Sequence, residues 1–176
     1  MHSRDQRQAT NAHEIIILAC LMCQSDESNV EYLLTNGLND LLIQVLQAND
    51  PGRPFFSLKV DTVVNRTLNN LLNCGASAVN LSESFIDGGS QWVLDRFAPR
   101  MAHNDLEARK EASHLMQSLL RIYSHNPEDC HRKVFLIQNY ELIRTSLSVL
   151  KNEHCERIVP LLLDIITLSV TKRIDL

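Results

Sequence analysis

The chain has 176 residues, of which 44% are hydrophobic and 22% are charged, and its formal net charge at pH 7 is −4. This composition is too apolar for a disordered chain, and the length allows one filled core or a short array of repeats. A negative net charge lacks the basic surplus that binding to phosphate backbones requires. Neither nucleic acid nor a membrane surface is therefore expected as the main ligand.

The first predicted element is a helix over residues 12–24, "AHEIIILACLMCQ". Its apolar run, residues 15–23, is about half the length that a bilayer span needs and lacks the flanks of a signal peptide. The chain has five cysteines, an odd number scattered through apolar helical patterns, which favours reduced thiols over a disulfide framework. We expect an intracellular protein of the cytoplasm or the nucleus.

A glycine interrupts the next helical stretch, "YLLTNGLNDLLIQVLQ" at residues 32–47. Apolar residues recur at spacings of three and four on both sides of Gly37, which indicates two helices that meet there. Glycine enters the left-handed conformation just past a helix end without steric penalty, and asparagine tolerates it better than most residues. The sequence predicts a corner at Gly37.

The same corner recurs twice along the chain, at Gly89 in "SFIDGGSQWVLDRF" and at Asn139 in "VFLIQNYELIRTSL". Each corner is followed, after a turn-forming interval, by a further amphipathic segment; these third helices are expected at residues 58–74, 106–123 and 155–170. The chain is thus divided into a leading partial repeat and three repeats, within a single domain over residues 1–176: 11–24, 29–74, 80–123 and 130–170.

The pattern resembles the armadillo-repeat family, which has three helices per unit, a glycine between the first two, and Leu-x-Asn-Leu in the third. Leu68, Asn70 and Leu71 match that motif. The resemblance implies an all-α fold, a right-handed α-solenoid of about three armadillo-like three-helix repeats plus the leading partial repeat. HEAT repeats, with two helices per unit, and an unrelated helical bundle are the structural alternatives.

The resemblance also implies a function, because stacked helical triplets line a concave face with their third helices, and such a face suits peptide or helical ligands. In the family, the asparagine that matches Asn70 hydrogen-bonds a ligand's backbone. Arg66 stands where the family's import receptors carry a tryptophan, so their regular ladder is absent. Helical spacing adds neighbours to this partner-binding face, which comprises Arg66, Asn69, Asn70, Asn73, His114, Gln117, Ser118 and Arg121.

We therefore expect a non-catalytic protein-protein interaction scaffold or adaptor, whose partner is a protein or peptide of acidic or mixed charge, since rim charges set encounter and specificity. The alternative is an architectural segment that docks through its ends, either to a longer solenoid or to a second copy as a homodimer. Bare apolar terminal repeats favour such docking.

Metal and catalytic chemistry find little support in the sequence. Cys20 and Cys23 form a C-x-x-C pair inside an apolar helical run, with no second pair at zinc-finger spacing. Helix capping by Asn104 or Asp105 explains the "HND" turn at residues 103–105 without a catalytic role. Trp92 is expected as a buried packing anchor. We expect no enzyme, no cofactor and no metal.

Overall fold

The computed structural model describes residues 2–23, 32, 35–73, 85, 90–125 and 140–174. Within these residues the chain forms seven helices and no strand, which confirms the all-α class. The chain divides into two compact units, Met1–Asn70 and Leu71–Leu176. Among the described residues, no helix combines the length and apolar character that a membrane crossing requires.

The first unit contains α1 (His2–Cys23), α3 (Leu38–Ala48) and most of α4 (Leu58–Leu72). Gly37 precedes α3 with a φ of 83° and a ψ of 25°, the left-handed conformation that the sequence predicted there. The core of this unit consists of aliphatic side chains at helical spacing: Leu42, Ile43, Leu46, Val60, Val64 and Leu68. The predicted corners at Gly89 and Asn139 lie outside the described residues.

The loop between α3 and α4 is closed by one buried amide. Asn49 Nδ2 donates to the Ser57 carbonyl at 3.0 Å, and Asn49 Oδ1 accepts from the Ser57 N–H at 2.9 Å. Ser57 Oγ in turn accepts a long bond of 3.4 Å from the Val60 N–H at the start of α4. Asn49, the first residue of the turn-forming sequence 49–54, thus fixes the backbone of Ser57 immediately before α4 begins.

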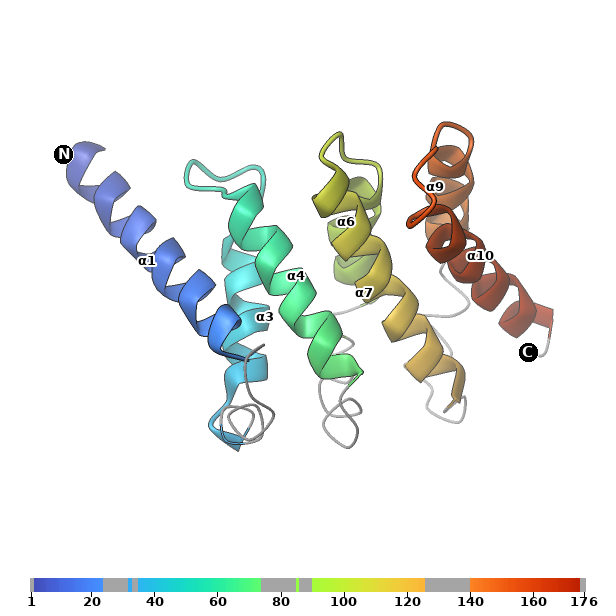
Figure 1. Ribbon diagram of the computed structural model, residues 1–176, viewed down its shortest axis with the longest axis horizontal. Helices are drawn as coiled ribbons and strands as arrows, with labels where there is room; N and C mark the ends of the chain where they lie inside the picture. The colour runs from blue at the N-terminus through green and yellow to red at the C-terminus, as the bar shows by residue number, and fades with distance from the viewer. Residues whose placement is uncertain are drawn as a thin grey trace. The chain divides into compact units, whose positions relative to one another are not determined.

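The second unit contains α6 (Ser90–Met101), α7 (Leu106–His125), α9 (Tyr140–Leu150) and α10 (Val159–Ile174). These four helices form two layers: α7 and α10 lie side by side, and α6 and α9 lie side by side behind them (Figure 1). The core between the layers holds large apolar side chains: Phe97, Met101, Leu115, Met116, Leu119, Tyr123, Leu142, Leu162 and Ile165.

Trp92 belongs to an aromatic cluster at the start of α6. Its ring stacks on Phe85 with a centroid distance of 6.2 Å, and Phe85 also meets Phe97 at 6.1 Å. Phe85 and Phe97 are fully buried, whereas Trp92 is only partly buried. The tryptophan therefore packs at the edge of the core and does not fill its centre.

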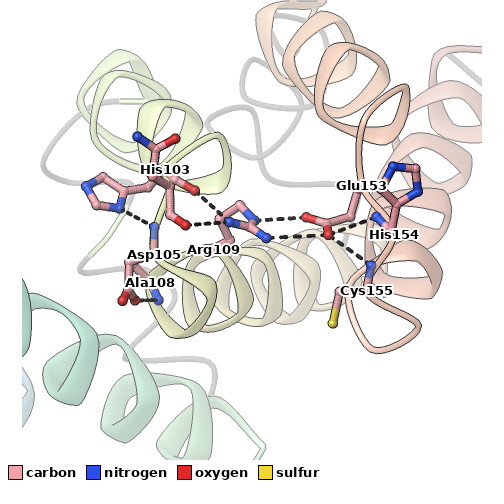
Figure 2. A network of polar contacts seen from close by, with 8 residues as sticks. His103, Asp105, Ala108, Arg109, Glu153, His154 and Cys155 are labelled. Atoms are coloured by element: carbon pink, nitrogen blue, oxygen red, sulfur yellow. Dashed lines mark hydrogen bonds and ion pairs between the residues drawn. The ribbon is translucent and has the colours of Figure 1, made fainter.

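Arg109, near the start of α7, joins two loops (Figure 2). Its Nη1 donates to the carbonyls of His103 and Asn104 at 3.0 and 2.9 Å, and its Nε donates to Glu153 Oε2 at 2.8 Å. Glu153 Oε1 also accepts from the backbone N–H groups of His154 and Cys155 at 3.1 and 3.0 Å. One guanidinium thus fixes the loop before α7 and the loop before α10.

The helix ends agree with the sequence where capping chemistry decides them. Asp105 Oδ1 accepts from the Ala108 N–H at 2.8 Å, which confirms the predicted cap of α7. The third helix expected from residue 155 begins instead at Val159, because residues 156–158 form a turn before Pro160 enters the first helical turn. The first helix begins ten residues earlier than expected, at His2.

Candidate functional site

The candidate site is a polar strip on α7, a helix that is otherwise almost enclosed. Most α7 side chains are buried in the second unit, including the charged Glu111. Along the middle of the helix, the least buried positions are one or two turns apart and share one face. We define the polar strip as Lys110, His114 and Arg121 at these positions, the buried Gln117 and Ser118 between them, and Asp164 on α10.

Asp164 connects the strip across the two helices. Gln117 Nε2 donates to Asp164 Oδ2 at 2.6 Å, and the guanidinium of Arg121 pairs with the same carboxylate oxygen. Asn73, just past α4, donates from Nδ2 to Ser118 Oγ at 3.2 Å. The structure therefore brings Gln117 and Arg121 together on one carboxylate, and it brings Asn73 to Ser118.

Sequence reasoning missed Asp164. The signal for it was present, because Asp164 is the one charged residue in the apolar segment "VPLLLDIITLSV". A buried or half-buried charge on an apolar helix needs a partner, and long donor side chains on the neighbouring third helix were already candidates. What the sequence did not contain was the register of α7 against α10.

The charges of the strip are balanced from within the protein. Lys110 Nζ lies 3.4 Å from Glu107 Oε2 and 3.6 Å from Glu111 Oε1, and Arg121 is paired with Asp164. Burial lowers the pKa of His114 below its ordinary value of 6.5; the charge of Glu111 opposes this shift and that of Lys110 reinforces it. At neutral pH the imidazole is therefore uncharged, with one nitrogen that donates and one that accepts.

The predicted residues of α4 lie on the more accessible side of that helix. Arg66 and Asn69 are partly exposed, and Asn70 and Asn73 are exposed. The residues between them, Thr67, Leu68, Leu71 and Leu72, are buried. Arg66, Asn69 and Asn70 belong to the first unit and Asn73 to the second. Partner binding by all eight residues stays a prediction.

Cysteine and histidine positions supply no metal centre in the described part of the chain, where no group of three or more His, Cys, Asp or Glu side chains could hold an ion. Cys20 is a buried free thiol on α1, and Cys155 is a partly buried one before α10. Cys74 and Cys130 lie outside the residues that the structure describes, and so does the side chain of Cys23.

Comparison of the chain with protein-family models gave no match. Comparisons with curated proteins and with solved structures gave none either. The functional argument therefore depends on the geometry of the two units.

Proposed function

We propose that the chain is a non-catalytic, intracellular interaction scaffold of armadillo-like helical triplets, which holds a peptide or helix of a partner protein on the third-helix face of its repeats. One observation carries this proposal. Two of the four residues predicted for partner binding on α7, His114 and Arg121, occupy accessible positions two turns apart on this otherwise buried helix, and the buried Gln117 and Ser118 lie between them. A row of hydrogen-bonding side chains at that position suits a ligand backbone.

The strip favours a polar or mixed-charge peptide over a strongly acidic one. Arg121 and Lys110 each have carboxylates beside them, so an acidic ligand would have to compete with Asp164, Glu107 and Glu111. The neutral His114 supplies a directional hydrogen bond without net charge, while the buried amide of Gln117 holds Asp164 in place. Binding then depends on shape and backbone hydrogen bonding, with charge setting the register.

The test is a selection of random linear peptides on the wild-type chain, followed by fluorescence-polarisation titration of the selected peptides. Each of Asn70→Ala, His114→Ala and Arg121→Ala is measured, with Gln44→Ala on the exposed side of α3 as the control. We expect at least one of these three variants to weaken binding about tenfold, the effect of removing a central contact. Peptides that bind all three variants as tightly as the wild type would refute the proposal.

A second candidate function rests on the exposed face of α1. Ile15, Leu18 and Leu21 are 68%, 60% and 52% exposed and recur every three residues, while Cys20 on the other side is fully buried. Three large aliphatic side chains on one helix face favour docking, either to a further solenoid unit or to a second copy.

The two candidate functions predict different results in a measurement of self-association. If docking through α1 is the main role, the mass measured by sedimentation equilibrium should rise with concentration and fall to that of the monomer in Leu18→Asp. Peptide binding should then be unaffected by Asn70→Ala and Arg121→Ala. A monomer at all concentrations, with strip-dependent peptide binding, supports the scaffold function.

A further inference from the structure

A groove runs between α6 and α9, in the layer opposite to the one that carries the polar strip. It has two adjoining parts of about 390 and 460 Å³, which share Ala102, Ser148 and Val149 as lining residues. One wall consists of the small or compact side chains of Ala98 and Pro99 on α6 and of Ala102 just past its end. Such a wall allows another backbone to approach closely.

The α9 wall carries hydrogen-bonding side chains in a line. Thr145 and Ser148 are three positions apart and share one face of α9, and Asn152 lines the groove from the turn just past the end of that helix. No side-chain hydrogen bond forms at these three residues within the described part of the chain. Four other helical threonines, Thr62, Thr67, Thr167 and Thr171, each donate to the carbonyl four residues earlier. Thr145 lacks this usual bond, so its hydroxyl is available to a ligand.

Both ends of the groove are electrically balanced. Arg144 pairs with Glu141 at 2.8 Å at one end, and Arg109 pairs with Glu153 at 2.8 Å at the other. A phosphate or another compact anion would find its cationic partners already occupied. The lining of both parts contains no Phe, Tyr or Trp side chain, whereas such side chains are common in small-molecule sites. A neutral chain with alternating donors and acceptors fits this lining.

We propose that the groove between α6 and α9 is a second binding site, which takes an extended segment of a partner protein with small side chains. Glu141 and Val149, which both line the groove, are eight positions apart on α9, a helical rise of about 12 Å, and Asn152 extends the lining past the helix end. An extended chain covers that rise with about four residues. Ala98, Pro99 and Ala102 admit the small side chains, while Thr145, Ser148 and Asn152 hydrogen-bond the backbone. This site does not depend on the polar strip.

The test removes the strip first, so that the two sites are distinguished. Random linear peptides are selected on the chain that carries His114→Ala and Arg121→Ala, and their affinities are measured by fluorescence polarisation. Ala102→Trp fills the middle of the groove. The triple variant Thr145→Val, Ser148→Ala, Asn152→Ala removes its hydrogen-bonding groups at little change of shape. Thr167→Val with Thr171→Val on α10 is the matched control, and circular dichroism verifies that each variant is folded.

We expect Ala102→Trp and the triple variant each to weaken binding about tenfold or more, while the control stays within about twofold. N-methylation of one central peptide amide should also weaken binding about tenfold, because the backbone is what α9 recognises. Peptides that bind both folded groove variants with unchanged affinity would overturn the proposal. Failure to enrich any peptide on the strip-disabled chain would overturn it too, and would leave the scaffold function of the strip standing.

Discussion

The loop that leads into α4 and the loop that leads into α10 reach similar order by different means. In the first, the neutral amide of Asn49 bonds both backbone groups of Ser57, eight residues along the same loop. In the second, Glu153 is fixed by Arg109, 44 residues earlier and on another helix. The first device is local and uncharged, and the second is distant and charged. They should therefore respond differently to mutation and to pH.

The largest expected effect is that of Arg109→Ala, which removes every bond of the guanidinium at once. The Glu153 side chain is only 6% exposed, so its carboxylate would remain buried without its cation. We expect the free energy of unfolding of the second unit to fall by about 3 kcal/mol. Urea denaturation followed by the fluorescence of Trp92, the single tryptophan of the chain, measures this.

Arg144→Ala is the matched control, because Arg144 pairs with Glu141 one turn away and both side chains are well exposed, at 67% and 48%. Its effect should stay within about 0.5 kcal/mol. Equal losses in the two arginine variants would mean that the distant ion pair does not hold the second loop.

The next largest effect is expected at the local hydrogen bonds between Asn49 and Ser57. Asn49→Ala leaves the N–H and the carbonyl of Ser57 without their bonds, at a position where Asn49 is 6% exposed. We expect a loss of about 2 kcal/mol in the first unit, measured by amide hydrogen exchange of α3 and α4. Asn152→Ala, at an exposed asparagine, should change stability little. A loss at residue 152 as large as at residue 49 would contradict the comparison.

A smaller effect is expected at Gly37, where the cost lies in the backbone alone. A Cβ there would meet nothing within 4 Å, but the φ of +83° is unfavourable for alanine. Gly37→Ala should cost about 1 kcal/mol, and Gly37→Asn less. At Gly52, whose φ is not positive, the added Cβ would lie 3.1 Å from the exposed, movable Asp50 Oδ1, so Gly52→Ala should cost less than Gly37→Ala. The reverse order would show that Gly37 is not held in its corner by conformation.

The difference between local interactions and contacts between distant parts of the chain also decides what the sequence could predict. Gly37, the cap at Asp105 and the third helices α4 and α7 follow from residues within one or two turns, and the structure agrees with them. The accessible face of α7 follows from helical period alone. Asp164 and the Arg109–Glu153 pair depend on which helices become neighbours and in which register, and no local pattern contains that information. The repeat architecture itself stays a prediction, since two of the three corners lie outside the described residues.

The smallest effect is the dependence of the second loop on pH. Burial, the largest single influence, raises the pKa of Glu153, but hydrogen bonds from Cys155, Arg109 and His154 together with the charge of Arg109 outweigh it, so the pKa lies below its ordinary value of 4.5. The folded chain therefore binds this proton more weakly than the unfolded chain. The stabilisation is complete above that ordinary value and is lost as the pH falls through the lower folded pKa. Glu153→Gln should have a lower free energy of unfolding than the wild type at neutral pH, and this difference should narrow as the pH falls below 4.5, the ordinary value. The difference in free energy of unfolding between Asn49→Ala and the wild type should stay constant over the same pH range, because the amide of Asn49 does not titrate. If the difference in free energy of unfolding between Glu153→Gln and the wild type stayed constant with pH, the two loops would not differ in their response to pH as the Arg109–Glu153 ion pair predicts.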